Sequence, residues 1–143
     1  MLVKQISVFL ENKSGRLAEV TKRLAEKNID IRALSIADTT DFGILRLIVN
    51  KPEEAEEYLK ENGFMVSAAT VIAIVIEDRP GGLSVVLESL ENQSIAIEYM
   101  YAFVGKSGKE ALVILRVEDN LKALETLKNN NIKVVPSSKV YDI

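Results

Sequence analysis

Two short loops carry residues that are suited to binding an anion. Residues 11–17 read ENKSGRL and residues 77–83 read EDRPGGL, and a segment with apolar residues at helical spacing follows each of them. A loop that leads into a helix presents unpaired backbone amides and a partial positive charge, which favour a carboxylate. A glycine at the bend lets a ligand approach the backbone closely because no Cβ stands in the way. The two loops are therefore candidate sites.

A second candidate is the segment IEYMYAF at residues 97–103. Glu98 interrupts an apolar run there, and Tyr99 and Tyr101 place two phenols one residue apart. A tyrosine hydroxyl needs a polar partner when it is buried. The segment is either a strand that packs into a core or the wall of a ligand pocket.

The amino-acid composition excludes most kinds of catalytic site. The 143 residues include no cysteine and no histidine, which excludes disulfides, thiol nucleophiles, histidine acid–base chemistry and the common zinc sites. No converging acid and base can be named among the remaining residue types, so we expect no enzyme activity, no metal and no cofactor. The net charge of −3 argues against nucleic-acid binding. No apolar run reaches the roughly 20 residues of a membrane span and no signal-peptide pattern is present, so we expect a cytoplasmic protein.

The chain contains two copies of one unit. With a shift of 66 residues, Gly15 aligns with Gly81, and Leu17, Leu24 and Ile31 align with leucines or isoleucines. Beyond residue 104 a shift of 68 aligns the copies better, which assigns two extra residues to the loop at residues 104–110. We therefore predict two domains, at residues 1–70 and 71–143.

Hydrophobic periodicity predicts the same order of elements in both copies. Ser14 is expected to cap the first helix, and Pro52 and Gly63 are expected to begin and end the second. The predicted strands and helices, in chain order, are a strand at 5–11, a helix after Gly15, strands at 27–38 and 42–50, a helix at 51–63 and a strand at 64–70, then a strand at 71–77, a helix after Gly81, strands at 93–104 and 110–118, a helix at 119–131 and a strand at 132–143.

This order predicts an α+β fold of two ferredoxin-like βαββαβ units. Right-handed crossovers put both helices of a unit on one face of a four-stranded antiparallel sheet. The last strand of the first copy runs into the first strand of the second without a glycine or proline linker. We therefore expect the two units to pack side by side.

Strict alternation along residues 95–103 places Ile97, Tyr99 and Tyr101 on one face of a strand, and Glu98 and Met100 on the other. In the first copy Ala33 and Ser35 stand where the second has Tyr99 and Tyr101. Two phenols that only one copy carries are not needed by a symmetric core, which makes them candidates for a ligand pocket. An ion pair between Glu98 and its counterpart Arg32 is the structural alternative.

The repeat order and the first loops resemble tandem ACT domains, small regulatory modules that bind amino acids. The second copy has the family's acidic–x–Pro–Gly–x–Leu pattern in Asp78, Pro80, Gly81 and Leu83, whereas the first has Asn12 and Ser14 in place of the acid and the proline. The resemblance covers the whole chain. More narrowly, the chain resembles stand-alone proteins that consist of two ACT domains. It implies units paired side by side, with an amino acid bound at their interface near the first loop of one and the second strand of the other.

The leading hypothesis is thus a non-catalytic sensor that binds a free amino acid at the interface between its two ACT units. The loops hold the α-carboxylate, Asn12 or Asp78 holds the ammonium group, and Glu98 with the tyrosines shapes the side-chain pocket. A homodimer and a metabolic enzyme as target are compatible partners, and the alternative is a ligand-free interaction module. The candidate ligand-binding residues are Asn12, Ser14, Gly15, Arg16, Leu17, Asp78, Pro80, Gly81, Gly82, Leu83, Glu98, Tyr99, Met100 and Tyr101.

Overall fold

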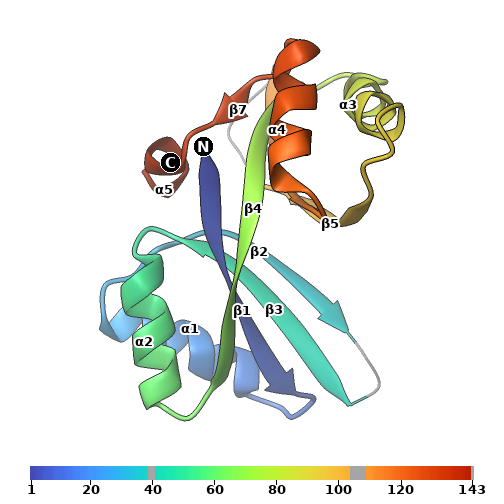
Figure 1. Ribbon diagram of the computed structural model, residues 1–143. Helices are drawn as coiled ribbons and strands as arrows, with labels where there is room; N and C mark the ends of the chain where they lie inside the picture. The colour runs from blue at the N-terminus through green and yellow to red at the C-terminus, as the bar shows by residue number, and fades with distance from the viewer. Residues whose placement is uncertain (39–40, 104–108, 143) are drawn as a thin grey trace. The chain divides into compact units, whose positions relative to one another are not determined.

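The computed structural model describes residues 1–38, 41–103 and 109–142, so most of the loop that contains the two-residue insertion lies outside the described residues. Seven strands and five helices form in the described part of the chain, which confirms the α+β class (Figure 1). In chain order they are β1 (Leu2–Glu11), α1 (Arg16–Glu26), β2 (Ile31–Asp38), β3 (Phe42–Val49), α2 (Pro52–Glu61), β4 (Met65–Glu77), α3 (Gly82–Glu91), β5 (Ile97–Ala102), β6 (Glu110–Val117), α4 (Asn120–Asn129), β7 (Val134–Val135) and α5 (Ser137–Tyr141).

The chain forms two compact units that exchange its ends. The first unit comprises Lys4–Ala69 together with the residues from Tyr141 onward, and the second comprises Thr70–Val140 together with Met1–Val3. Each chain end therefore belongs to the unit that the other repeat mainly builds. The repeat alignment does not reveal this exchange.

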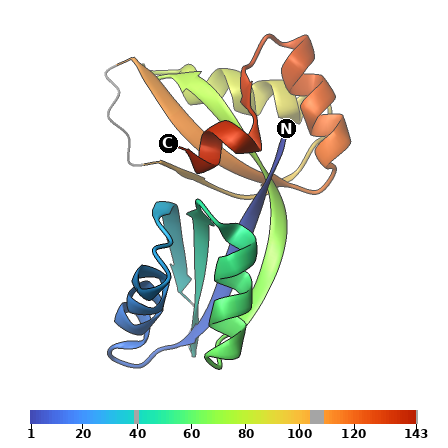
Figure 2. The same cartoon turned by 90° about the vertical axis from the view of Figure 1, so that its left-hand side faces the viewer.

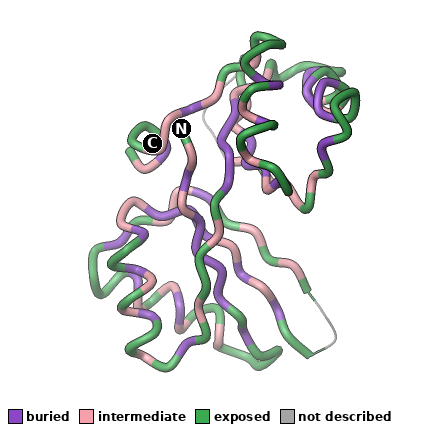
Figure 3. Tube along the Cα trace, viewed as in Figure 1, coloured by how far each residue is buried: buried purple, intermediate pink, exposed green. Residues whose placement is uncertain are grey.

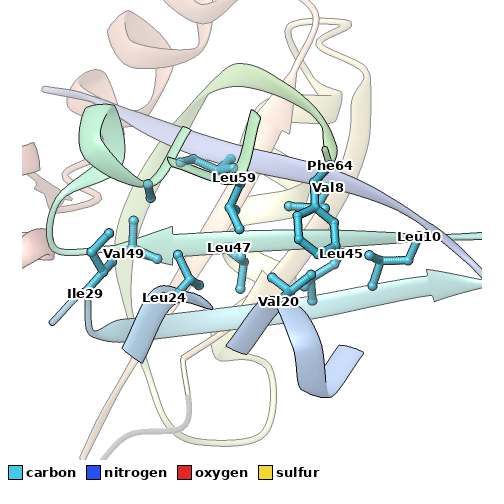
Figure 4. Close-up of a cluster of buried hydrophobic side chains, with 12 residues drawn as sticks. Val8, Leu10, Val20, Leu24, Ile29, Leu45, Leu47, Val49, Leu59 and Phe64 are labelled. Atoms are coloured by element: carbon cyan, nitrogen blue, oxygen red, sulfur yellow. The ribbon is translucent and has the colours of Figure 1, made fainter. Parts of the chain in front are cut away.

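The first unit has the strand order β2-β3-β1-β4, and its β1–β3 and β2–β3 pairs are antiparallel. Helices α1 and α2 lie on the same side of its strands (Figure 2). Val20 and Leu24 of α1 and Leu59 of α2 point toward Leu45 and Leu47 of β3 (Figure 4). The predicted helix-on-sheet layering is confirmed for this unit, with a core that excludes water between the two layers.

The second unit has the strand order β4-β6-β5, and β7 pairs with β4 antiparallel. Its core joins Val86 and Leu90 of α3 to Ala123 and Leu127 of α4 and to the strands. The middle of β4, residues 71–74, is buried and appears purple in Figure 3, which has the same view as Figure 1. β4 is a single 13-residue strand, so the predicted passage from one repeat into the next without a linker is confirmed.

The prediction of a long last strand at residues 132–143 is wrong. Only Val134 and Val135 pair with β4, and α5 follows directly. Pro136 has no N–H to donate to a ladder, and its carbonyl instead accepts from the amides of Lys139 and Val140. The chain therefore turns into a short helix whose Val140 is fully buried.

The predicted alternation of faces along the second strand of each repeat is also wrong. The register slips by one residue between Ile31 and Ala33 of β2, and between Ile97 and Tyr99 of β5. Such a β-bulge adds a residue to one strand and moves all later side chains to the opposite face. Ile97 therefore pairs with Val117 on the core side, whereas Tyr99 and Tyr101 lie on the other face.

Tyr141 binds the beginning of the first unit's central strand. The backbone N–H of Lys4 donates to the Tyr141 hydroxyl at 2.9 Å, and Arg32 Nε donates to the Tyr141 carbonyl at 3.0 Å. Burial raises the pKa of Tyr141 above its ordinary value. Lys4 Nζ also pairs with Glu56 Oε1 at 2.9 Å, and this hydrogen bond holds the pKa of Glu56 below its usual value and raises the pKa of Lys4.

The Lys4–Glu56 pair predicts a pH-dependent contribution to stability. Because the folded-state pKa of Glu56 is depressed, the contribution is present above the ordinary value of 4.5 and is lost as the pH falls through the lower folded-state pKa. We expect Glu56→Gln to cost about 0.2–1 kcal/mol at neutral pH and much less in acid. Urea unfolding at about pH 7 and about pH 3 measures this. The control variant is Glu57→Gln, because Glu57 is the exposed neighbour of Glu56 in the chain. An equal cost of Glu56→Gln at both pH values would contradict the prediction.

Candidate functional site

The loop before α1 (residues 11–17) and the loop before α3 (residues 77–83) have the same backbone hydrogen bonds. In each loop one amide donates to a carbonyl two residues earlier, a second donates across to the chain that leads into the third strand of the repeat, and a third donates to the glycine carbonyl from within the helix. These bonds are Lys13 N to Glu11 O (2.7 Å) and Arg79 N to Glu77 O (3.0 Å), Asn12 N to Asp41 O (3.3 Å) and Asp78 N to Lys109 O (2.9 Å), and Glu19 N to Gly15 O (3.0 Å) and Val85 N to Gly81 O (3.2 Å). The repeat shifts of 66 and 68 residues are thus confirmed atom by atom.

A glycine in the left-handed region precedes each helix. Gly15 has φ +88° and Gly81 has φ +86°, a backbone conformation that glycine adopts without steric cost. Each glycine is the N-cap residue, so the prediction that Ser14 caps α1 is wrong: Ser14 lies one residue too early, and the glycine at the N-cap has no side chain that could accept from the first turn. By contrast, Asp119 caps α4 by accepting from Lys122 N at 3.1 Å. The first-turn amides of α1 and α3 therefore have no carboxylate or hydroxyl cap of this kind.

The second loop is the more tightly packed of the two. Gly82, the first residue of α3, is buried, and a Cβ built on it would lie 2.1 Å from the Glu77 carbonyl oxygen. Only glycine fits there without a shift of the backbone. The first repeat has Arg16 at this position, and its backbone N–H is 3.4 Å from the Lys13 carbonyl, whereas Gly82 N is 3.0 Å from Arg79 O.

A cavity of about 270 Å³ lies beside this second loop, inside the second unit. The loop, the first turns of α3 and the segment that joins α4 to β7 all contribute to its lining. Its charged residues are of both signs, with apolar residues between them. The lining residues are Val75, Ile76, Glu77, Arg79, Gly82, Val85, Val86, Glu110, Asn130, Asn131, Ile132 and Lys133.

Arg79 lines the cavity and makes two bonds within its own loop. Its Nε donates to the Glu77 carboxylate, and its Nη1 donates to the Pro80 carbonyl at 3.2 Å. These bonds use two of the five N–H donors of a guanidinium. The pair is exposed, which keeps the net energy of the ion pair small and lets the side chains exchange partners readily.

Arg16 in the first loop is arranged differently. Its Nη1 pairs with Glu19 Oε2 at 2.9 Å, and its guanidinium carbon lies 4.9 Å from the centre of the Phe64 ring. Its Nε is buried and has no hydrogen-bond partner among the described residues. The other predicted residues of this loop, Asn12, Ser14 and Leu17, are exposed. The two loops thus share a backbone but present different side chains.

The structure brings few of the predicted site residues together at the cavity. Gly82 lines it, Pro80 supplies the carbonyl that holds Arg79, and Asp78, Gly81 and Leu83 lie in the same loop or in the first turn of α3. The four predicted residues of β5, from Glu98 to Tyr101, do not line it, because β6 separates β5 from β4 in the sheet. The loop and the strand therefore do not share this cavity.

The contacts of β5 explain two of its residues. Met100 packs against the hydrophobic core of its unit. Glu98 Oε2 pairs with Arg116 Nε at 3.2 Å, and Arg32 pairs with Asp30 at 3.0 Å. Each residue thus has a partner within its own unit, and the alternative of an ion pair between Glu98 and Arg32 stays a prediction.

Several cavity residues were missed from the sequence. Glu110 and the segment from Asn130 to Lys133 are distant from the loop in the chain. A signal was present in the run of three asparagines at residues 129–131, because asparagine tolerates the left-handed region. Asn131 has φ +58° at the position where the first repeat has Gly63, φ +85°.

A family model described as an ACT domain pair matches residues 1–143, which is the whole chain. The chain belongs to this family. The ACT domain pair is 43% identical to protein BT0572 from Bacteroides thetaiotaomicron, whose crystal structure superimposes with a TM-score of 0.94 and with coverage of 100% of this chain and 98% of that one. A search of curated proteins finds no match.

More distant structures show the same fold. The regulatory subunit of aspartate kinase from Thermus thermophilus, in its ligand-free form, is 19% identical, with a TM-score of 0.64 and coverage of 89% of this ACT domain pair and 91% of that chain. The corresponding subunit from Thermus flavus is 17% identical, with a TM-score of 0.63 and coverage of 92% and 95%. In the described residues of this ACT domain pair, no helix is long and apolar enough to cross a membrane, and no cluster of three His, Cys, Asp or Glu side chains could hold a metal ion.

Proposed function

We propose that this ACT domain pair is a non-catalytic regulatory protein that binds a free amino acid at the loop between β4 and α3, residues 77–83. The observation that carries the proposal is the cavity of about 270 Å³ beside that loop, whose lining includes Glu77 and Glu110 as well as Arg79 and Lys133. A free amino acid is a zwitterion and needs groups of both signs close together. A cavity with only one sign of charge would not suit it.

The lining residues suggest a role for each part of the ligand. The α-carboxylate would bind the guanidinium of Arg79 beside the start of α3, where the helix dipole also favours negative charge. The ammonium group would bind the carboxylates of Glu77 and Glu110. Val75, Ile76, Val85 and Val86 leave an apolar wall for the amino-acid side chain. These contacts favour an amino acid with an apolar side chain.

Thermal unfolding of the full chain with each of the twenty amino acids at millimolar concentration tests the proposal. A ligand present at about 100 times its dissociation constant stabilises the folded state by about 2.7 kcal/mol, so at least one amino acid should raise the melting temperature. Arg79→Gln should remove that shift. Arg23→Gln, on the exposed face of α1 with its own Glu26 partner, is the matched control and should retain it. If none of the twenty raises the melting temperature, the proposal fails.

A second candidate, a ligand-free interaction module, is favoured by the exposed edge of the first unit. Strand β2 ends the strand order of that unit, and its Leu34 and Ile36 are 49% and 48% exposed. An edge strand with apolar side chains is a template for pairing with another chain. Association of the protein with itself or with an enzyme, detected by light scattering without any stabilisation by amino acids, would favour this candidate over the first.

A further inference from the structure

A second cavity, of about 400 Å³, lies where α4 leads into β7. Four of its lining residues are apolar: Met1, Leu124, Ile132 and Val134. The last three are half-buried and pack against the core of the second unit. The apolar wall of the cavity is therefore an extension of that core. A volume of this size is within the range of roughly 300–1,000 Å³ that is usual for small-molecule sites.

The backbone around this cavity is fixed by hydrogen bonds. Ile132 N donates to Leu127 O at 2.9 Å, which ends α4. The Lys133 carbonyl accepts from Val75 N at 3.0 Å, and Val134 pairs with Ile74 in the sheet. These bonds hold the end of α4, the connecting residues 131–133 and the start of β7, which together form most of the lining.

Its charged lining residues are both cations. Lys128 and Lys133 are exposed at the cavity, Asn131 adds an amide, and none of the residues that line it is acidic. This differs from the loop cavity, where Glu77 and Glu110 can accept from an ammonium group. A zwitterion would leave its ammonium group beside two lysines. The charges therefore select a ligand with a single negative charge and an apolar body.

We propose that this second cavity binds an aliphatic monocarboxylate of the fatty-acid class. The hydrocarbon chain lies against Leu124, Ile132 and Val134, where it extends the core, and the carboxylate binds the ammonium groups of Lys128 and Lys133. The C-terminal end of a helix carries a partial negative charge. The carboxylate therefore binds the lysine side chains and stays away from the last carbonyls of α4.

Calorimetric titration of the full chain with butyrate, hexanoate and octanoate tests this proposal. Burial of each further CH₂ group should strengthen binding by about fourfold, with one molecule bound per chain. Octylamine should bind far more weakly than octanoate, because its ammonium group would lie beside the two lysines. Equal binding of octanoate, octylamine and octanol, or affinity that does not rise with chain length, would overturn the proposal.

Substitutions locate the site. Lys128→Gln should weaken octanoate binding about two- to fivefold, the size expected for an exposed charge pair. Lys122→Gln, also on α4 but absent from the lining of this cavity, should leave it unchanged. Arg79→Gln should also leave it unchanged, since Arg79 lines only the loop cavity. An unchanged affinity in Lys128→Gln, or an equal loss in Lys122→Gln, would show that octanoate binds elsewhere.

Discussion

Replacement of Gly82 by alanine is expected to destabilise the second unit by about 1–3 kcal/mol, the usual cost of adding atoms where the packing has no room. The new Cβ would lie 2.1 Å from the Glu77 carbonyl oxygen and 3.2 Å from its carbonyl carbon. Those atoms belong to the backbone of the loop, so no side-chain rotation can relieve the contact. The loop must move away from the start of α3, and the bond from Gly82 N to Arg79 O lengthens with it.

The matched control for this change is Gly43→Ala in β3. Gly43 is also buried, but the nearest atom to a Cβ there is 3.8 Å away, which is ordinary van der Waals contact. Guanidinium unfolding of both variants should show a clear loss for Gly82→Ala and a much smaller change for Gly43→Ala. A similar stability for the two variants would mean that the loop yields at little cost, and the tight packing would then not explain why the position is glycine.

The features that could be predicted from the sequence are those with a local physical cause. Gly15 and Gly81 were recognised at the bend before each helix, and both adopt the left-handed backbone conformation that glycine tolerates best. Helices α1 to α4 were predicted correctly from apolar residues at helical spacing, such as Val20 with Leu24 and Val86 with Leu90. Because the two copies align, each helix or strand that was predicted in one copy was also expected at the aligned residues of the other. This is why the order of elements was correct along nearly the whole chain.

The features that were missed depend on partners distant in the chain. The bulges at Arg32 and Glu98 have no sequence marker of their own, yet each one reverses the face of every later residue in its strand. The loop cavity joins Glu77 to Glu110 and Lys133, three segments that only the fold brings together. The C-terminal end joins the first unit through bonds from Lys4 N and Arg32 Nε to Tyr141, residues that are more than 100 positions apart in the chain. Periodicity within a segment carries no information on such pairings.

The second prediction concerns the two cores, and it uses one substitution at equivalent positions. Leu24 of α1 and Leu90 of α3 are fully buried, and the carbonyl of each accepts from the amide five residues later at 3.0 Å. Each belongs to the core of its own unit, and the two cores share no residue. Leu24→Ala and Leu90→Ala should each cost about 2–5 kcal/mol, from lost burial plus the cavity that remains.

Hydrogen exchange measures where this cost falls, because it reports the opening of individual amides. Leu24→Ala should lower the protection of α1, β1 and β3, and Leu90→Ala that of α3 and β6. Leu17→Ala is the control, since Leu17 lies on the same helix as Leu24 but is 40% exposed, and it should cost well under 1 kcal/mol. A loss spread equally over all elements in both variants would contradict two separate cores. The protein would then unfold as one cooperative unit, in which a ligand at the second loop would stabilise the first repeat as strongly as its own.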